Sequence, residues 1–175
     1  RHPSRQTRRV RSRQGSHPGH GRPRDAAPGA ALVTDLDYDG NDELIIGTLD
    51  GRVHSLSNTR SINWLFDAGG AIQAIADLKH VDRRDSSVIV AGNSESEIGD
   101  KSSWIQLREA RGEREWEYML ESPISSLIIA DVVFGGDPEI IAGTENGKLV
   151  ILSSLGELSW EMAILPGEAS IIYLA

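Results

Sequence analysis

Residues 35–48 read DLDYDGNDELIIGT, an acid-rich turn that runs directly into a short apolar segment closed by glycine. The apolar part, Glu43-Leu-Ile-Ile-Gly47, is rich in β-branched residues and is bounded by Asp, Asn and Gly. Short β-branched runs with such boundaries favour strands over helices, which need longer periodic segments. The stretch therefore predicts a turn followed by a β-strand, and the same outline returns twice further along the chain.

The outline recurs about every 45 residues, which is the size of one propeller blade of four short strands. In each copy an aspartate closes a short apolar strand, a turn and a β-rich run ending in glycine follow, and a tryptophan strand completes the unit. The aspartates are Asp35, Asp77 and Asp131, and the tryptophans are Trp64, Trp116 and Trp160. The sequence thus predicts an all-β chain, a partial β-propeller of about three four-stranded antiparallel blades near residues 31–75, 76–127 and 128–175.

Glycine-containing dipeptides mark the hairpins inside these units. Asp50-Gly51 and Asn146-Gly147 are the residues preferred in type I′ turns, which need positive φ at both central positions. The second copy is longer, and its extra residues fall in a polar hairpin loop at 93–102. Residues 104–115 would also tolerate a helix, but register with the other copies favours two strands and a turn at Arg111-Gly112.

The aromatic and histidine side chains have structural interpretations first. A tryptophan at the same place in each copy predicts packing between neighbouring blades, where an indole buries a large apolar area, and ligand stacking is the alternative. His54 and His80 have no His, Cys or catalytic Ser partner apparent in the sequence. We expect both histidines on surface or half-buried strands, and neither as a metal ligand.

The first turn carries the strongest candidate site. Its acids stand at alternate positions, followed by Gly40, which suits a sharp backbone turn. Three carboxylates on a turning backbone can converge on one hard cation, and without a cation they would repel one another. The predicted metal ligands are Asp35, Asp37, Asp39, Asn41 through a carbonyl oxygen, and Glu43. Calcium (Ca2+) is favoured over magnesium because the ligand set is large and flexible. The alternative is a solvated turn whose side chains bond only the local backbone.

Two comparisons within the sequence limit this hypothesis. An EF-hand opens in a similar way but needs a bidentate acid at loop position 12 and flanking helices. Position 12 is Ile46, inside the predicted strand, so the EF-hand interpretation fails. The turns at 77–85 and 131–139 lack the two middle acids, and we expect them to be metal-free turns of the same outline.

Charge divides the chain into a basic arm and an acidic body. Residues 1–25 hold eight arginines and one acid, for a charge of +7, and the remaining residues carry −15. Residues 1–30 are rich in Pro, Gly and Ser and contain no aromatic residue, so a disordered arm is predicted. The arm could neutralise phosphates of nucleic acid or anionic lipid, or it could be a solvated tail or sequence ahead of the natural start. Without aromatics to stack bases, specific nucleic-acid binding is not expected.

Several classes of protein are disfavoured by what the sequence lacks. There is no cysteine, so disulfides and thiolate metal sites are excluded. No apolar run approaches the roughly 20 residues of a membrane helix, and no apolar signal core follows Arg1. A Gly-rich phosphate loop, a nucleophile elbow and paired His ligands are also missing, which disfavours catalysis. None of these features decides the cellular compartment.

The stretch at 35–48 resembles the FG-GAP repeat of integrin-α-type, VCBS-like propellers, and the tryptophan strands also resemble the PQQ-like propeller repeat. In the FG-GAP family the loop between the first two strands of a blade binds calcium, and the resemblance implies the same five ligands. It covers about residues 30–175. It implies a seven- or eight-bladed propeller used for adhesion or as a protein-interaction scaffold, with an extracytoplasmic or cell-surface location favoured.

The sequence therefore predicts a non-enzymatic scaffold that binds a protein or a glycan, with the long polar loop at 93–101 facing the partner. The alternative is the propeller domain of an enzyme, of the quinoprotein dehydrogenase or polysaccharide lyase type, for which no residues can be nominated. Three blades cannot close a ring, and an open arc leaves sheet faces and edges bare. We expect the chain to be a fragment that needs the remaining blades of a larger propeller.

Overall fold

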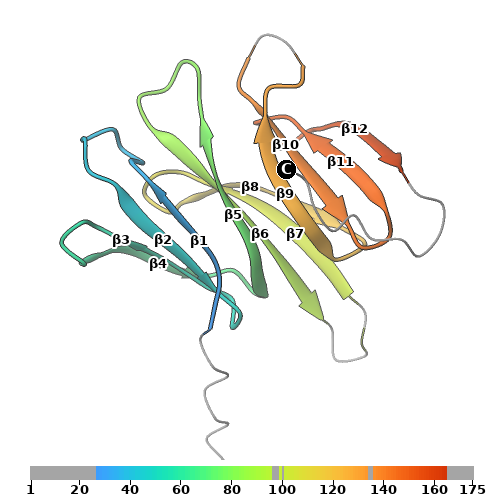
Figure 1. The fold of residues 1–175 in the computed structure, drawn as a ribbon, viewed down its shortest axis with the longest axis horizontal. Helices are drawn as coiled ribbons and strands as arrows, with labels where there is room; N and C mark the ends of the chain where they lie inside the picture. Colours follow the sequence, from blue (N-terminus) through green and yellow to red (C-terminus); the bar gives the residue numbers. More distant parts are fainter. Residues whose placement is uncertain (1–26, 96–98, 100, 134–135, 165–175) are drawn as a thin grey trace, which may run out of the picture.

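A computed structural model describes residues 27–95, 99, 101–133 and 136–164 (Figure 1). The first sheet contains β1 (Pro28–Thr34), β2 (Glu43–Thr48), β3 (Arg52–Leu56) and β4 (Ile62–Asp67). The second contains β5 (Ala71–Lys79), β6 (Ser86–Glu95), β7 (Lys101–Arg108) and β8 (Arg114–Leu120). The third contains β9 (Ile124–Ala130), β10 (Glu139–Thr144), β11 (Lys148–Leu152) and β12 (Leu158–Ala163).

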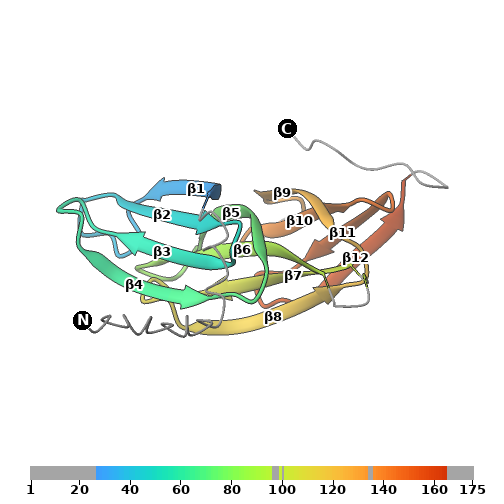
Figure 2. The ribbon, with the colours of Figure 1, turned by 90° about the horizontal axis from the view of Figure 1, so that it is seen from below.

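Each sheet is an antiparallel meander in which the strands pair in the order of the sequence. The three sheets stand side by side, with β1, β5 and β9 along one edge and β4, β8 and β12 along the other (Figure 2). Strand β5 contacts both β1 and β9. The predicted all-β class with three four-stranded antiparallel sheets is confirmed. In the described part of the chain no helix is long and apolar enough to cross a bilayer.

The second sheet is buried on both faces. Side chains of β6 alternate between the two neighbours, because successive residues of a strand point to opposite faces. Val88 and Val90 pack with Ile45 and Val53 of the first sheet. Ile89 and Ala91 face the other way and join the cluster shared with the third sheet, which includes Leu78, Ile105, Leu107, Ile140, Val150 and Leu152. Each fully buried Val, Ile or Leu contributes roughly 1.5–3 kcal/mol, so these two layers hold the sheets together.

Tryptophans connect neighbouring sheets, as predicted. The indole Nε1 of Trp64 in β4 donates a hydrogen bond to the backbone oxygen of Ala110 in the second sheet, at 2.7 Å. The indole Nε1 of Trp116 in β8 donates to the backbone oxygen of Ser154 in the third sheet, at 2.9 Å. Each acceptor lies in the turn between the third and fourth strands of its sheet. The exposed fraction of Trp160, at the same place in β12, is 46%.

A glycine completes each of these contacts. Gly112 and Gly156 have φ of +85° and +78°, in the left-handed region that favours glycine. A Cβ added at Gly112 would lie 2.8 Å from Cδ2 of Trp64, and one at Gly156 would lie 2.5 Å from Cδ2 of Trp116. The indole therefore lies directly against a backbone that has no side chain. Trp104 makes a related contact within the second sheet, where a Cβ at Gly92 would meet its ring at 2.4 Å.

The sheets start earlier than the sequence predicted. Their first strands begin at Pro28, Ala71 and Ile124, rather than near 31, 76 and 128. Residues 28–30, assigned to the disordered arm, belong to β1. The predictions for residues 1–26 and for the chain beyond 164 lie outside the described residues.

Asp77 was placed wrongly at the end of a strand. It lies inside β5, opposite Val88, and its carboxylate accepts a hydrogen bond from the Thr34 hydroxyl at 2.7 Å. The connection that follows β5 covers residues 80–85 and is two residues shorter than those at 35–42 and 131–138. Aligning the copies on their aspartates therefore shifted the second one, and His80 is the residue that follows its first strand.

The hairpin turns also differ from the prediction. Of each dipeptide the glycine alone has positive φ, so Asp50-Gly51 and Asn146-Gly147 do not form type I′ turns. A threonine organises both turns: the Thr48 hydroxyl donates to the Asp50 carboxylate and accepts from the Arg52 amide. Thr144 repeats these bonds in the third sheet, to Oδ1 of Asn146 at 2.6 Å and from the Lys148 amide at 3.1 Å.

In the second sheet the hairpin predicted as a loop at 93–102 is partly paired strand. Ser94 lies opposite Ser102 and Glu95 opposite Lys101, so the strands continue into the predicted loop. The structure agrees with two strands over 104–115: Gly112 lies in the turn, and its amide donates to the Glu109 carbonyl at 2.8 Å.

We expect Gly156→Ala to lower the free energy of unfolding by about 1–3 kcal/mol more than Gly69→Ala does. Both glycines have positive φ, +78° and +83°, so both alanines carry the same backbone strain. Nothing lies within 4 Å of a Cβ at Gly69, whereas a Cβ at Gly156 meets the Trp116 ring. Urea denaturation of the two variants measures the difference. Equal losses would show that the indole contact adds nothing to the strain.

Candidate functional site

Three aspartates gather in the connection between β1 and β2. Asp35, Asp37 and Asp39 each offer a carboxylate oxygen, and these oxygens lie within 4.8 Å of one another. Asp35 is half-buried, and the other two are exposed. The backbone turns sharply here, with φ of +56° at Tyr38, between Asp37 and Asp39, and +90° at Gly40, directly after Asp39. The alternate acids are thus brought together on one side of the turn, as the sequence predicted.

The aspartates also hold the turn through backbone amides. The Asp35 carboxylate accepts from the amides of Asp39 and Gly40, at 3.1 and 2.9 Å. Oδ1 of Asp39 accepts from the Asn41 amide at 2.7 Å. These bonds are those of a solvated Asp-rich turn, and they leave further lone pairs on the carboxylates for a cation.

Glu43 is not part of this cluster of oxygens, and the side chain of Asn41 bonds to Asp39 and to Asn58. Oε2 of Glu43 accepts from the Leu36 amide at 3.0 Å, and in the third sheet Oε2 of Glu139 accepts from the Val132 amide at 2.9 Å. A glutamate therefore holds the loop backbone both in the connection at 35–42, which has the three alternate aspartates, and in the connection at 131–138, which lacks the two middle ones. Oδ1 of Asn41 accepts from Nδ2 of Asn58 at 2.8 Å. The full five-ligand set stays a prediction.

Burial raises the pKa of Glu43, and the Leu36 amide opposes that effect. The negative charges of Asp37, Asp39 and Asp35 raise it further. The raised pKa of Glu43 thus reflects in part the negative charge of the three aspartates, which a cation in the loop would neutralise.

The same connection is attached to the second sheet. The Ser86 amide donates to the Leu36 carbonyl at 2.9 Å, and the Tyr38 hydroxyl lies 3.0 Å from Oγ of Ser86. The aspartate turn is therefore bonded across the interface between the first two sheets, and its conformation bears on how they pack.

A buried histidine joins the second and third sheets. Nδ1 of His80 lies 2.6 Å from Oδ2 of Asp137, and Nε2 lies 2.8 Å from Oγ of Ser87. The other oxygen of Asp137 accepts from the Val81 amide at 2.7 Å. His80 is 8% exposed, so the expectation of a surface or half-buried strand position was wrong. We name the set His80, Ser87 and Asp137 the histidine clamp.

The histidine clamp has the connectivity of a Ser-His-Asp triad, but its surroundings favour a structural role. Ser87 is 2% exposed and lies in β6, under the connection that carries His80. A nucleophile must reach a substrate carbonyl, whereas Ser87 and His80 are 2% and 8% exposed. No sequence motif pointed to the clamp, because Asp137 comes from a different sheet.

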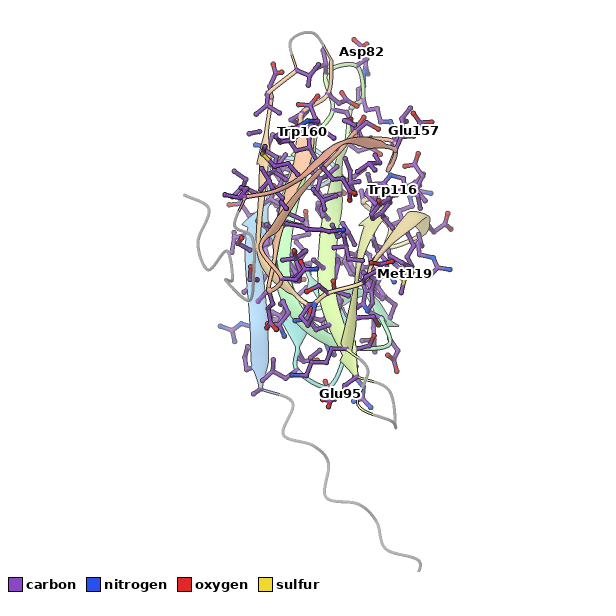
Figure 3. All side chains as sticks on the ribbon, turned by 90° about the vertical axis from the view of Figure 1, so that its right-hand side faces the viewer. Asp82, Glu95, Trp116, Met119, Glu157 and Trp160 are labelled. Atoms are coloured by element: carbon purple, nitrogen blue, oxygen red, sulfur yellow. The ribbon has the colours of Figure 1, made fainter. Side chains whose placement is uncertain are left out.

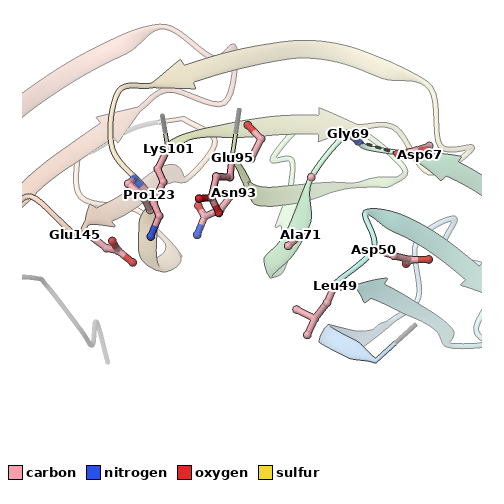
Figure 4. A pocket seen from close by; sticks show the side chains of 12 residues that line it. Leu49, Asp50, Asp67, Gly69, Ala71, Asn93, Glu95, Lys101, Pro123 and Glu145 are labelled. Atoms are coloured by element: carbon pink, nitrogen blue, oxygen red, sulfur yellow. Dashed lines mark hydrogen bonds between the residues drawn. The ribbon is translucent and has the colours of Figure 1, made fainter. Parts of the chain in front are cut away.

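The opposite ends of the three sheets surround a polar hollow of about 590 Å³ (Figure 4). Ala71, Asn93, Ser94, Glu95 and Lys101 from the second sheet line it. The other lining residues come from the first and third sheets and the linkers between sheets: Leu49, Asp50, Asp67, Gly69, Gly70, Pro123 and Glu145. The polar hairpin that the sequence predicted to face a partner therefore forms part of its wall. Residues 96–98 and 100 of that hairpin lie outside the described residues.

No protein-family model and no curated protein matches this chain. Solved structures do match. A chain in the crystal structure of BBS1N in complex with ARL6DN, soaked with lead, gives a TM-score of 0.61 at 14% identity, over 79% of this chain and 43% of that one. BamB from Moraxella catarrhalis gives 0.53 at 20% identity, over 77% of this chain and 36% of that one.

Both of these proteins are β-propellers, and at these identities the likeness shows the fold alone. The chain spans less than half the length of either structure. The three sheets are therefore consecutive blades of a partial β-propeller, as the sequence predicted.

We expect the histidine clamp to stabilise the protein in a pH-dependent way. Burial works to raise the pKa of Asp137, but the bonds from His80 and Val81 outweigh it and hold the pKa below its ordinary value. A depressed carboxyl pKa contributes stability that is complete above the unfolded value of about 3.9 and is lost as the pH falls through the folded value.

The free energy of unfolding of the wild type should therefore exceed that of Asp137→Asn at and above about pH 5, with a difference that shrinks below about pH 4. Urea denaturation across this range measures it. Asp82→Asn, an exposed acid of the connection at 80–85, is the control and should show no such trend. A constant difference for Asp137→Asn down to about pH 2 would contradict the clamp's electrostatic role.

Proposed function

We propose that this chain is part of a non-enzymatic propeller scaffold that binds a protein or a glycan in the polar hollow, with one calcium ion stiffening the aspartate turn. The observation that carries the proposal is the hollow itself, to which all three sheets contribute side chains. BBS1N, a chain of the same fold, is in complex with ARL6DN. That complex supports protein recognition as a use of the fold.

The aspartate turn fits a hard cation by its donor set. Three carboxylates within 4.8 Å of one another supply oxygen ligands of the kind that Ca2+ prefers. Asp35, Asp37 and Asp39 would hold the ion, and Asn41 and Glu43 would join the shell if their present partners were released. Since the turn is bonded to Ser86, a bound ion would stiffen the contact between the first two sheets.

We expect calcium to raise the melting temperature of the wild type and not that of Asp37→Asn/Asp39→Asn. With a dissociation constant of about 10⁻⁴–10⁻³ M, as in extracellular modules, about 10 mM calcium adds about 1.4–2.7 kcal/mol. That corresponds to a shift of roughly 3–10 °C for a chain of this size.

The matched control is Asp42→Asn, which removes an exposed acid of the same turn that lies outside the cluster. Its shift with calcium should match that of the wild type. Thermal melting with calcium, magnesium or chelator measures each variant, and an unchanged wild-type melting temperature at about 10 mM calcium would exclude the ion.

The hollow suits a polar or cationic partner surface. The residues that line it include the acids Asp50, Asp67, Glu95 and Glu145 together with Lys101. In Figure 4, Glu145 and Lys101 lie on one side of the hollow and Leu49 and Asp50 on the other, on strands and turns of different sheets. A ligand that spans the hollow would contact several sheets together and would stabilise their packing.

Screens of a glycan array and a displayed peptide library with the full chain should return ligands whose affinity depends on the hollow. For a cationic ligand we expect Glu95→Lys to weaken binding about tenfold or more and Lys101→Glu to strengthen it, because each reverses a charge in the lining. Arg84→Glu, on the opposite end of the second sheet, is the control. Lys101→Glu and Arg84→Glu change the net charge equally, so a ligand that responds equally to both would bind through net charge and would contradict the assignment.

We also propose that the chain is not catalytic. The support is the burial of Ser87 and His80, which are 2% and 8% exposed, so that neither group is within reach of a substrate. The enzyme alternative, a quinoprotein dehydrogenase or polysaccharide lyase domain, has no particular residue here in its favour.

A further inference from the structure

The chain enters the first sheet at the rim of the polar hollow. The Leu49 amide donates a hydrogen bond to the Ala27 carbonyl at 2.9 Å, and Pro28 lies opposite Thr48 at the start of β1. Leu49 lines the hollow, where Figure 4 labels it. The residues ahead of Ala27 lie outside the described part of the chain, but their covalent bond to Ala27 tethers them at this rim.

The aspartate turn lies at the far end of the same strand. β1 carries the chain from Pro28 to Thr34, which is roughly 20 Å at about 3.3 Å per residue. Figure 3 shows Glu95, in the wall of the hollow, and Asp82, in the connection after β5, at opposite ends of the molecule. A segment tethered at Ala27 therefore meets the hollow before it meets the acids of the aspartate turn.

The segment ahead of Ala27 is basic. Residues 1–25 hold eight arginines and one acid, for a charge of +7, and Arg22 and Arg24 come five and three residues before Ala27. At no more than about 3.6 Å per residue, the Cα atoms of these two arginines cannot lie farther than about 18 and 11 Å from that of Ala27. Both are therefore within reach of the hollow.

The lining of the hollow has the opposite charge. Its described residues include one base, Lys101, and four acids, Asp50, Asp67, Glu95 and Glu145, for a formal charge of −3. The charge is −2 if Arg52 is included, since its Nε lies 3.8 Å from Oδ2 of Asp50. Lys101 lies opposite Glu95 on the paired strands, so it offsets one acid locally and leaves the hollow negative.

A guanidinium suits such a lining by its geometry. Oδ1 of Asp67 accepts from the Gly69 amide at 2.9 Å, and a carboxylate has further lone pairs for a second donor. An arginine side chain presents a planar fork of donors that can bind a carboxylate through two bonds. A short tether also gives an effective concentration of the order of mM, so individually weak ion pairs suffice to hold the segment.

We propose that the hollow binds the chain's own basic segment, residues 1–26, through Arg22 and Arg24, and that a cationic partner enters by displacing it. This inference rests on the proposed function in one respect, because it takes the hollow as a recognition site for cationic groups. It adds an occupant that the chain itself supplies, and a regulation of the site, since the tethered segment lowers the affinity for any competing ligand.

A single spin label in the basic segment tests the contact without any external ligand. The chain contains no cysteine, so Gly21→Cys provides one position for a nitroxide. The amide signals of Gly70 and Ser94, both in the wall of the hollow, report by their paramagnetic broadening how often the segment lies there.

Reversing charges of the lining should release the segment. In Glu95→Lys/Glu145→Lys the broadening should fall about threefold or more, because acids that attract the arginines become bases. The matched control, Asp42→Lys/Asp82→Lys, makes the same change of net charge at the other end of the sheets and should leave the broadening unchanged.

Arginine variants test the two named residues. Arg22→Gln/Arg24→Gln should reduce the broadening about threefold or more, whereas Arg1→Gln/Arg5→Gln removes the same charge farther from the tether and should keep most of it. Equal losses in a variant and its matched control would show attraction by net charge alone and would overturn the proposal. Broadening passed from a spin-labelled chain to a separate isotope-labelled chain would show that a second copy supplies the segment, which would overturn it too.

Ligand binding separates this inference from the proposed function. For a cationic ligand of the hollow, Arg22→Gln/Arg24→Gln should tighten binding about threefold or more, since the ligand no longer competes with the segment. The expected broadening in a chain that captures no ligand would support this inference and contradict the proposed partner. Ligands that need Glu95 but bind equally to the wild type and the arginine variant would support the hollow as a site and overturn the role of the segment.

Discussion

The fold depends on the covering of each sheet's apolar faces by its neighbours. Within the described chain the second sheet depends on this covering on both of its faces. Val88 and Val90 of β6 pack against the first sheet, and Ile89 and Ala91 pack toward the third. The indole contacts also fix the position of each sheet relative to the next. An apolar layer alone would let sheets slide, whereas the bond from Trp64 to the Ala110 carbonyl sets one position.

The connections at one end of the sheets fix the same two interfaces by different chemistry. Ser86 bonds toward the first sheet through Leu36 and Tyr38, and the next residue, Ser87, bonds to His80, which reaches Asp137 of the third sheet. Successive residues of β6 point to opposite neighbouring sheets. This alternation begins at Ser86 and Ser87, which bond to the first and third sheets, and continues in the apolar side chains from Val88 to Ala91. The aspartate turn belongs to this layer, so any ion that it holds acts on a sheet interface.

Much of this architecture was predictable because it repeats locally. Short β-branched runs, hairpin glycines and evenly spaced tryptophans gave the number and kind of sheets, and alternate acids indicated that Asp35, Asp37 and Asp39 converge. The misplaced Asp77 shows the limit of such alignment, since a connection two residues shorter hides which residue follows the strand. The histidine clamp and the Glu43 contact with Leu36 depend on backbone positions that sequence spacing does not specify.

The strictly sequential meander of each sheet also has a consequence during synthesis. The first sheet is complete once Asp67 has left the ribosome, yet the sheet that covers Val53 and Trp64 ends only at Leu120. At about 5–20 residues per second, translation of the intervening segment takes on the order of 3–10 s. During those seconds the apolar side chains that the second sheet covers, Val53 among them, have no partner sheet yet.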